Sequence, residues 1–192
     1  MAAKLHTIVF STRPGRVGPS VAKWFHDIAL RHPGFESELV DLADFNLPVY
    51  DEPEHPRLRK YRHEHTKAWS RSVDAADAFV FVTPEYNHSP APSFMNALDF
   101  VYTEWNYKPA AFVSYGGVSG GLRAVQSSKP FLSALRMVPI VESVTIPMVS
   151  QHLDAQRNFS ATKIHEDSAR VLLDELARWA EALKPMRAPP AA

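Results

Sequence analysis

Five short apolar segments alternate with stretches of helical periodicity, and this alternation constrains the fold more than any other feature of the chain. The apolar segments cover residues 5–10, 38–42, 78–83, 110–114 and 138–146. The third of them, AFVFVT, is apolar at successive positions, which is typical of a strand covered on both faces of a parallel sheet. The pattern therefore predicts an α/β three-layer sandwich around a five-stranded parallel sheet. Right-handed crossovers make 2-1-3-4-5 the expected strand order.

Between these segments, apolar residues recur every three or four positions, which predicts helices. The helices are expected near residues 21–28, 58–76, 94–105, 122–135 and 164–183, the fourth of them interrupted or kinked at Pro130. We expect one domain over residues 1–184, because the chain length suits a single core. Residues 185–192 carry few large apolar side chains, and we expect them to form a mobile C-terminal tail.

Charge and residue usage exclude several classes of protein. Lys and Arg total 21, as do Asp and Glu, so no net charge draws the chain to nucleic acid or to an anionic membrane. The chain has no cysteine, which excludes thiol nucleophiles, disulfides and cysteine-ligated metals. The first residues lack the apolar core of a signal peptide, and no apolar run reaches the length of a membrane span. We therefore expect a cytoplasmic protein.

Three segments rich in glycine, proline and polar residues begin where the first, third and fourth strands are expected to end. They are residues 11–18 (STRPGRVG), 84–89 (PEYNHS) and 115–121 (YGGVSGG). In the expected order these three strands are neighbours. Ligands of open α/β sheets bind outside the carboxyl ends of the strands, where the connections diverge. The three segments, although distant in sequence, are therefore expected to meet in one crevice.

The first segment has the composition of an anion site. A helix N-terminus offers unpaired N–H groups, hydroxyl groups and arginine forks add donors, and glycine lets the backbone approach a ligand. The residues that supply these groups are Ser11, Thr12, Arg13, Gly15, Arg16, Gly18 and Ser20. Their spacing matches neither a Walker loop nor Gly-x-Gly-x-x-Gly, which disfavours an NTPase or an ordinary dinucleotide domain. A plain strand-to-helix turn with two solvated arginines accounts for the same residues equally well.

The second and third segments suit a flat heteroaromatic ring. Such a ring needs stacking on its face and hydrogen bonds at its rim, which Tyr86 and Asn87 could supply. The glycines of residues 116–121 expose N–H groups that could reach ring carbonyl oxygens. A turn that caps the next helix through Ser89 or Ser93, followed by a flexible glycine turn, is the alternative. Three such loops on adjacent strand ends favour the ring site.

Three stretches of the sequence together resemble the NADPH-dependent FMN reductase family, whose members are flavodoxin-like proteins that include quinone, azo and chromate reductases. The stretches are STRPGRVGPSVAKWF, TPEYNHS followed by NALDFVY, and KPAAFVSYGGVSGG. The resemblance implies that FMN is the cofactor and that three sets of residues hold it. The first set would hold the phosphate, the second the ring, and the third the pyrimidine edge of the ring. The first set is Ser11, Arg13, Arg16, Val17, Gly18 and Ser20, the second is Pro84, Glu85, Tyr86 and Asn87, and the third is Ser114, Tyr115, Gly116, Gly117 and Ser119. One departure is Phe10, where family members usually have glycine, and its side chain could tighten the site.

The resemblance also implies an activity. Hydride would pass from NADPH or NADH through FMN to a quinone, an azo compound, a metal oxyanion or free flavin, with no catalytic side chain, because the flavin carries the chemistry. We predict ping-pong kinetics, since the nicotinamide must leave before an acceptor stacks on the ring. Arg16 is the candidate partner of the NADPH 2′-phosphate. The family implies a homodimer or homotetramer with flavin near the subunit contact.

Two other functions remain open at this point. Gly117-Val-Ser-Gly-Gly121 matches the nucleophile elbow of serine hydrolases, with Asp154 and His165 following in the right chain order. A non-catalytic flavin carrier is the second alternative. The histidines carry no metal-site pattern: His63 and His65 are two apart on an expected helix and should point to different faces, and we expect no metal site.

Overall fold

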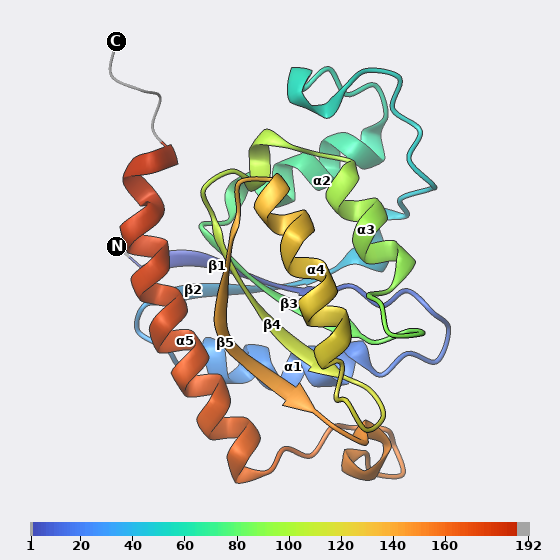
Figure 1. The fold of residues 1–192 in the computed structure, drawn as a ribbon, viewed down its shortest axis with the longest axis vertical. Helices are drawn as coiled ribbons and strands as arrows, with labels where there is room; N and C mark the ends of the chain where they lie inside the picture. The colour runs from blue at the N-terminus through green and yellow to red at the C-terminus, as the bar shows by residue number, and fades with distance from the viewer. Residues whose placement is uncertain (1, 188–192) are drawn as a thin grey trace.

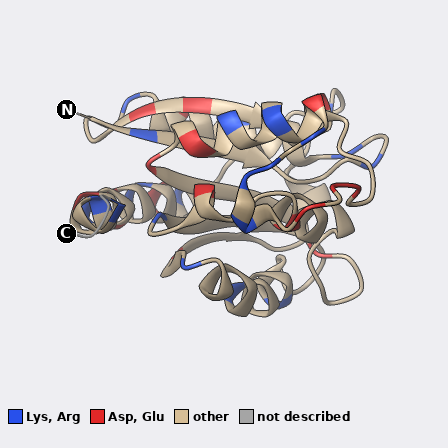
Figure 2. Cartoon of the chain, turned by 90° about the horizontal axis from the view of Figure 1, so that it is seen from above, with Lys and Arg blue, Asp and Glu red and all other residues tan. Residues whose placement is uncertain are grey.

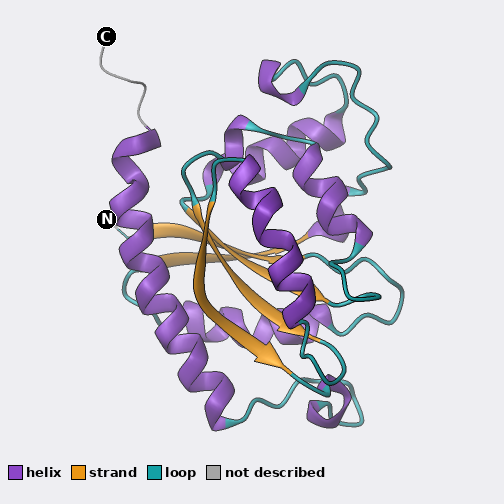
Figure 3. Ribbon diagram, viewed as in Figure 1, coloured by secondary structure: helices purple, strands orange, loops and turns teal. Residues whose placement is uncertain are grey.

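The computed structural model describes residues 2–187 and shows a three-layer arrangement around one parallel sheet (Figure 1). The described residues form five strands: β1 (Ala3–Val9), β2 (Phe35–Asp41), β3 (Ala78–Pro84), β4 (Pro109–Tyr115) and β5 (Val138–Ile146). All neighbouring pairs are parallel and the order is β2-β1-β3-β4-β5, which confirms the predicted topology. Figure 3 shows the strands between two groups of helices.

The helices cover the two faces of the sheet with separate apolar cores. One core joins the sheet to α1 (Gly18–Ala29) and α5 (Lys163–Leu183). The other core joins it to α2 (Glu64–Ala75), α3 (Pro92–Asp99) and α4 (Leu122–Ala134). All seven residues of β3 and all seven of β4 are buried, because these strands lie inside the sheet and are covered on both sides. Figure 2 shows that acidic and basic residues are both spread over the outside of the fold, around the buried sheet.

Phe10 lies in the second core. Its ring makes edge contacts with Phe81 and Phe94, at centroid distances of 5.1 and 4.6 Å, and the residue is fully buried. Ser11, the next residue, faces the opposite side of the sheet, because successive side chains of an extended strand alternate. The large side chain at position 10 therefore fills the core beneath α3 and does not enter the predicted phosphate loop.

Several element boundaries differ from those predicted. β2 begins at Phe35, three residues before the predicted 38–42 segment, and α2 begins at Glu64 after a separate 3₁₀ turn (Pro56–Leu58). The helix predicted over 94–105 is divided into α3 and a 3₁₀ turn (Thr103–Trp105). At this break in the helix the buried Trp105 folds back, and its indole N–H donates to the carbonyl of Leu98 in α3 at 3.3 Å. Pro130 lies inside α4 without interrupting it.

A short turn after α5 extends past the predicted domain boundary at residue 184. Lys184–Arg187 form a 3₁₀ turn, and Arg187 pairs with Asp77 at 2.8 Å. The rest of the predicted tail, residues 188–192, lies outside the described residues. Within residues 2–187, no helix combines the length and the apolar character needed to cross a bilayer.

Candidate functional site

The loops that follow β1, β3 and β4 lie side by side at the carboxyl edge of the sheet, as expected. The register pairs Val9 with Val82 and Pro84 with Tyr115, so the three strands end within two residues of one another. Glu85 N–H donates to the carbonyl of Tyr115 at 3.2 Å, which joins the second loop to the third. The structure thus brings the three predicted segments to one edge.

The first loop encloses a cradle between β1 and the start of α1. Ser11 is fully buried, and its Oγ forms no hydrogen bond of good geometry within residues 2–187, although the Tyr115 phenol lies beside it. Gly18 lies directly against it: a Cβ on Gly18 would be 2.2 Å from Ser11 Oγ and 2.9 Å from Tyr115 Oη. No side chain caps the N-terminus of α1, whose N-cap is Val17. A buried free hydroxyl beside an uncapped helix N-terminus fits an anionic group.

The two arginines of this loop are in different states. Arg16 donates to both carboxylate oxygens of Asp41 at 2.6 Å and to the carbonyl of Ser11 at 2.5 Å. The hydrogen bonds that Arg16 donates to Asp41 raise the pKa of Arg16, and the pair fixes the loop against the end of β2. Arg13 is exposed, and its guanidinium has no partner in the described part of the chain. Arg13 is therefore the arginine that is free to meet an anion, while Arg16 holds the loop in place.

A distant segment supports the same loop from the other side. Phe159 N–H donates to Ser20 Oγ at 2.6 Å, and Arg157 donates to the carbonyl of Gly15 at 2.7 Å. Residues 157 and 159 belong to the connection between β5 and α5. Nothing in the sequence pattern marked them, because they gain this role only when the connection folds back over the start of α1.

The second loop is a tight turn. Tyr86 and Ser89 exchange two backbone hydrogen bonds of 2.9 Å, and the two residues between them, Asn87 and His88, have φ of 50° and 68°. This pair of left-handed residues is the pattern of a type I′ turn, which asparagine tolerates well. Tyr86 is half-buried and Asn87 is exposed, so both side chains are accessible at this edge.

Glu85 ties the second loop to the third. Its carboxylate accepts from Ser119 Oγ at 2.8 Å, from Arg123 Nε at 2.7 Å and from Arg123 N–H at 3.2 Å. The side chain is only 6% exposed. Burial alone would raise its pKa, but the hydrogen bonds from Arg123 and Ser119 outweigh burial, and the pKa lies below its ordinary value. Glu85 and Ser119, both predicted to meet the ring, thus bond to each other, and Arg123 completes a link that the sequence did not indicate.

The third loop presents free backbone donors. The N–H groups of Gly117, Val118 and Ser119 donate no hydrogen bond to any acceptor in residues 2–187. The loop closes on Gly121, whose φ is 88° and whose missing Cβ would lie 2.8 Å from Ser114 Cβ. Ser114 itself is fully buried and donates to the carbonyl of Gly120 at 2.9 Å, so it shapes the turn from below.

The loop is also fastened to the chain beyond β5. Gly116 accepts from Val149 N–H at 3.0 Å, and Gly117 accepts from Met148 N–H at 2.9 Å. Tyr115 packs in the first core below the loop, and burial raises the pKa of its phenol to about 12. The phenol is therefore neutral at physiological pH and can donate.

The structure does not assemble a serine hydrolase triad. Ser119 Oγ bonds to Glu85, Arg123 and the Gly121 N–H, and no histidine is a partner of Ser119 among the residues described. His165 instead forms the capping box of α5 with Thr162. Asp154 accepts from Asn158 in a local turn. The three groups of the predicted triad therefore make separate contacts.

His63 and His65 lie together, so the prediction that they point to different faces is wrong. His63 is the extended N-cap of α2, not a helical residue, and the two rings stack at 5.1 Å with an interplanar angle of 5°. Their Nε2 atoms lie 3.8 and 3.0 Å from the carboxylate of Asp51. In the part of the chain covered by the structure, no group of three or more His, Cys, Asp or Glu residues is arranged to hold a metal ion.

Comparison with known proteins gives the geometry a context. An NAD(P)H-dependent FMN reductase of Schizosaccharomyces pombe is 42% identical over 148 residues, which cover 75% of this chain and 74% of the relative. An NADPH azoreductase of a Bacillus species is 32% identical over 143 residues, covering 72% of this chain and 75% of that enzyme. Among solved structures, the flavoenzyme NAD(P)H:(acceptor) oxidoreductase FerB of Paracoccus denitrificans has the same fold, with a TM-score of 0.73 over 94% of this chain and 98% of FerB at 23% identity.

The family assignment rests on a match that spans the sheet and all three loops. The model of the family described as NADPH-dependent FMN reductase matches residues 3–151, from β1 to the 3₁₀ turn after β5. The sheet order is that of flavodoxin-like proteins, in agreement with the resemblance noted in the sequence. The chain belongs to the NADPH-dependent FMN reductase family.

Proposed function

We propose that this protein is an NAD(P)H-dependent oxidoreductase that holds FMN at the carboxyl edge of its sheet and reduces small acceptors such as quinones and azo compounds. The observation that carries the proposal is the cradle between Ser11 and Gly18, where a buried hydroxyl without a partner lies beside an uncapped helix N-terminus. A buried polar group without a partner is rare and favours a ligand that satisfies it. Family membership supports the same cofactor.

The first loop would hold the phosphate. Ser11 Oγ, the hydroxyl of Ser20 and the N–H groups of Val17 and Gly18 are its proposed donors. Pro19 has no N–H, and the Ser20 N–H already donates to the carbonyl of Val17. Arg13 supplies a free positive charge that suits a phosphate dianion. The Arg16–Asp41 pair keeps the loop in this shape.

The second and third loops would hold the ring. Pro84 and Tyr86 offer apolar and aromatic surface, Asn87 offers an amide, and the free N–H groups of Gly117 and Ser119 can donate to ring carbonyl oxygens. The link from Glu85 to Ser119 and Arg123 fixes the distance between the two loops, so we propose that Glu85 positions the ring site. Gly116, Tyr115 and Ser114 would form the floor under the pyrimidine edge.

FMN bound here would supply the hydride chemistry, taking hydride from a nicotinamide and giving it to an acceptor. The protein's own part is to orient the ring and to keep one face of it open for two substrates in turn. No side chain needs to move a proton for the hydride transfer itself. The donor preference, the acceptor, a homodimeric or homotetrameric assembly and a cytoplasmic location stay predictions.

An absorption experiment tests the proposal. Purified protein is mixed with excess FMN, freed of unbound flavin, and its spectrum is recorded before and after NADPH is added without oxygen. We expect flavin absorption to stay with the protein and to bleach on NADPH addition, and initial rates with a quinone to give the parallel lines of ping-pong kinetics. A protein that takes up no flavin would refute the FMN site, and one that binds FMN without turnover would support the carrier alternative.

A further inference from the structure

A second cavity lies at the amino edge of the sheet, on the opposite side from the three loops. It has a volume of about 980 Å³ and is bordered by the starts of β3, β4 and β5 and by the 3₁₀ turn that follows α5. Strands of seven residues separate the two edges, a length of about 20 Å at 3.3 Å per residue. The cavity is therefore distinct from the proposed FMN site, and an inference about it does not depend on that proposal.

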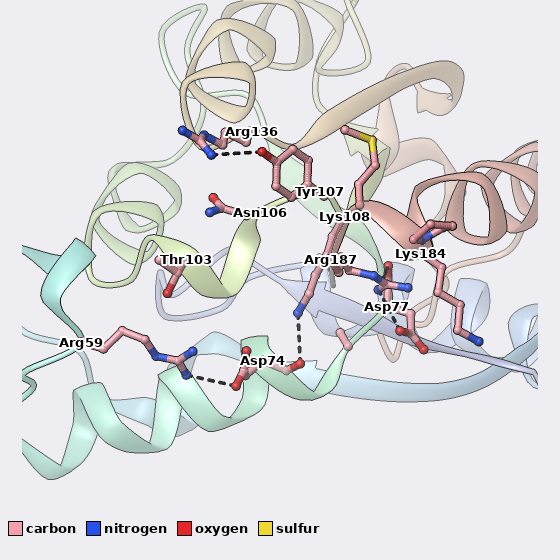
Figure 4. A pocket seen from close by; sticks show the side chains of 13 residues that line it. Arg59, Asp74, Asp77, Thr103, Asn106, Tyr107, Lys108, Arg136, Lys184 and Arg187 are labelled. Carbon is pink, nitrogen blue, oxygen red and sulfur yellow. Dashed lines mark hydrogen bonds and ion pairs between the residues drawn. The ribbon is translucent and has the colours of Figure 1, made fainter. Parts of the chain in front are cut away.

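The lining of this cavity is strongly basic in a protein with no net charge. Five of its residues are basic and two are acidic, whereas the whole chain has 21 of each sign. The basic residues are Arg59, Lys108, Arg136, Lys184 and Arg187, and the acidic ones are Asp74 and Asp77. Figure 4 shows these side chains arranged around the space from several elements. Such a concentration of one sign attracts anions.

Three of the five basic groups are already held by the protein. Arg59 pairs with Asp74 at 3.0 Å, and Arg187 pairs with Asp77 at 2.8 Å. Lys108 is buried and donates to two carbonyls at the C-terminal end of α2, at 2.8 and 3.0 Å. These contacts hold the walls of the cavity in place.

Within residues 2–187, the side chains of the other two cations bond to neither a carboxylate nor a carbonyl. In this described part of the chain, the Arg136 guanidinium donates only to the hydroxyl of Tyr107, at 3.0 Å, and no carboxylate pairs with either Arg136 or Lys184. Arg136 lies before β5 and Lys184 follows α5, so the two approach the cavity from different elements. Lys108 also lacks a carboxylate partner, but its ammonium is bonded to two carbonyls. Arg136 and Lys184 are therefore the two positive charges left to meet a ligand that carries about two negative charges.

Two residues that line the cavity have an unusual backbone conformation. Tyr107 and Arg136 both have left-handed backbone, with φ of 58° and 57°, and Tyr107 N–H donates to the carbonyl of Arg136 at 2.9 Å. Large residues rarely adopt this conformation, and such outliers concentrate at ligand sites. The pairing holds the Tyr107 ring and the Arg136 guanidinium side by side at the rim, as Figure 4 shows.

We infer that this cavity binds a small phosphate monoester that carries a flat organic group. A phosphate monoester has a charge between −1.5 and −2 at neutral pH, which the Arg136 and Lys184 pair would balance. The flat group would lie against the Tyr107 ring and the apolar side chains of Pro185 and Met186, which line the same space. The volume exceeds what inorganic phosphate alone would fill and suits a nucleotide-sized molecule.

The test is a calorimetric titration of the FMN-loaded protein with adenosine 5′-monophosphate as the probe. Arg136→Asn removes the charge but keeps a residue that tolerates left-handed backbone, and Lys184→Gln removes the second charge. We expect each variant to lower the affinity for the probe at least fivefold. Arg178→Gln, which removes an exposed arginine from the outer face of α5, is the matched control and should leave the affinity unchanged. Thermal melts verify that the variants fold.

Ligand comparisons separate the sources of binding. Adenosine should bind at least tenfold more weakly than its monophosphate, and inorganic phosphate should also bind more weakly because it lacks the flat group. No binding of the monophosphate at millimolar concentration, or equal binding by the wild type and both variants, would overturn the inference. Binding of succinate in place of the monophosphate would overturn the ligand class. FMN content and reduction by NADPH should be the same in all four proteins, so failure here is distinguishable from failure of the proposed function.

Discussion

Replacing Gly18 by alanine tests the cradle that carries the proposed function. The added Cβ would lie 2.2 Å from Ser11 Oγ, 2.9 Å from Tyr115 Oη and 3.0 Å from Val9 Cγ1, well inside the usual separation of about 3.5–4.0 Å. The Ser11 hydroxyl can rotate away, but Tyr115 and Val9 are 5% and 1% exposed and have no room to move. The substitution therefore acts as overpacking.

The expected magnitude follows from that environment. Overpacking a tight core costs about 1–3 kcal/mol, whereas Gly→Ala at an unstrained position stabilises by roughly 0.4–1 kcal/mol. We expect a net loss of about 1–2 kcal/mol, or a fall in Tm of roughly 2–8 °C for a domain of this size. Adding Ser11→Ala removes the closest contact, so Gly18→Ala should cost about 1 kcal/mol less in that background.

The assay is a double-mutant cycle. Urea unfolding of the flavin-free protein gives the stability of Gly18→Ala, Ser11→Ala and the double variant, and quenching of flavin fluorescence gives the FMN Kd. Ser11→Ala alone should raise the Kd about tenfold, because a hydrogen bond to a charged group contributes roughly 1.5 kcal/mol. Gly117→Ala is the control for stability, since its Cβ would meet no atom within 4 Å. Additive stability effects, or an unchanged Kd in Gly18→Ala, would refute the cradle as described.

Three further predictions concern residues that hold the site or the fold. Glu85→Gln breaks the 2.7 Å charged hydrogen bond between Glu85 and Arg123, so it should lower FMN affinity about tenfold and also lower Tm. Glu181→Gln, at an exposed position, is the control. Equal Tm and equal FMN affinity in the two variants would show that the Glu85–Arg123 bond does not hold the site. Burial lowers the pKa of Lys108 to about 8, so above pH 8 the unfolded chain binds a proton that the native protein has lost. The difference in Tm between the wild type and Lys108→Met should therefore rise between pH 7 and 10. A Tm difference that does not change with pH would contradict this prediction. Arg16→Ala should change the KM for NADPH and NADH equally because its guanidinium is paired with Asp41, whereas a rise confined to NADPH would assign Arg16 to the 2′-phosphate.

The strands could be predicted because their burial leaves a direct mark on the sequence. β5 spans the predicted residues 138–146, and the apolar run at 78–83 lies within β3. β2 is at the edge of the sheet and alternates buried and exposed residues irregularly, so its start at Phe35 carried no clear signal. The end of α3 was missed for a different reason: it depends on where the Trp105 indole finds an acceptor, which is a tertiary contact.

The loops could be placed from the sequence, but the contacts within them could not. Strand order alone brings residues 11–18, 84–89 and 115–121 to one edge. The partners that fix these loops are Asp41, Arg123 and Arg157, which come from segments without distinctive composition. From the sequence alone, a charged side chain in such a segment is predicted to face solvent, because its partner is brought near only by the fold. The same limit made Arg16 look like a free anion ligand.

The way in which the loops are held has a consequence for ligand binding. The first loop is fixed by the Arg16–Asp41 pair and by Phe159, and the second and third loops are fixed to each other by Glu85. All of these bonds join protein groups, so they restrict the loops independently of a bound ligand. A site ordered in advance loses little conformational entropy on binding, which favours affinity. Ser11 Oγ and the free N–H groups of the third loop are then the donors left for the proposed flavin. Substitutions at these groups should change flavin affinity through lost contacts, whereas substitutions at Asp41, Glu85 or Arg157 should change it through loop order.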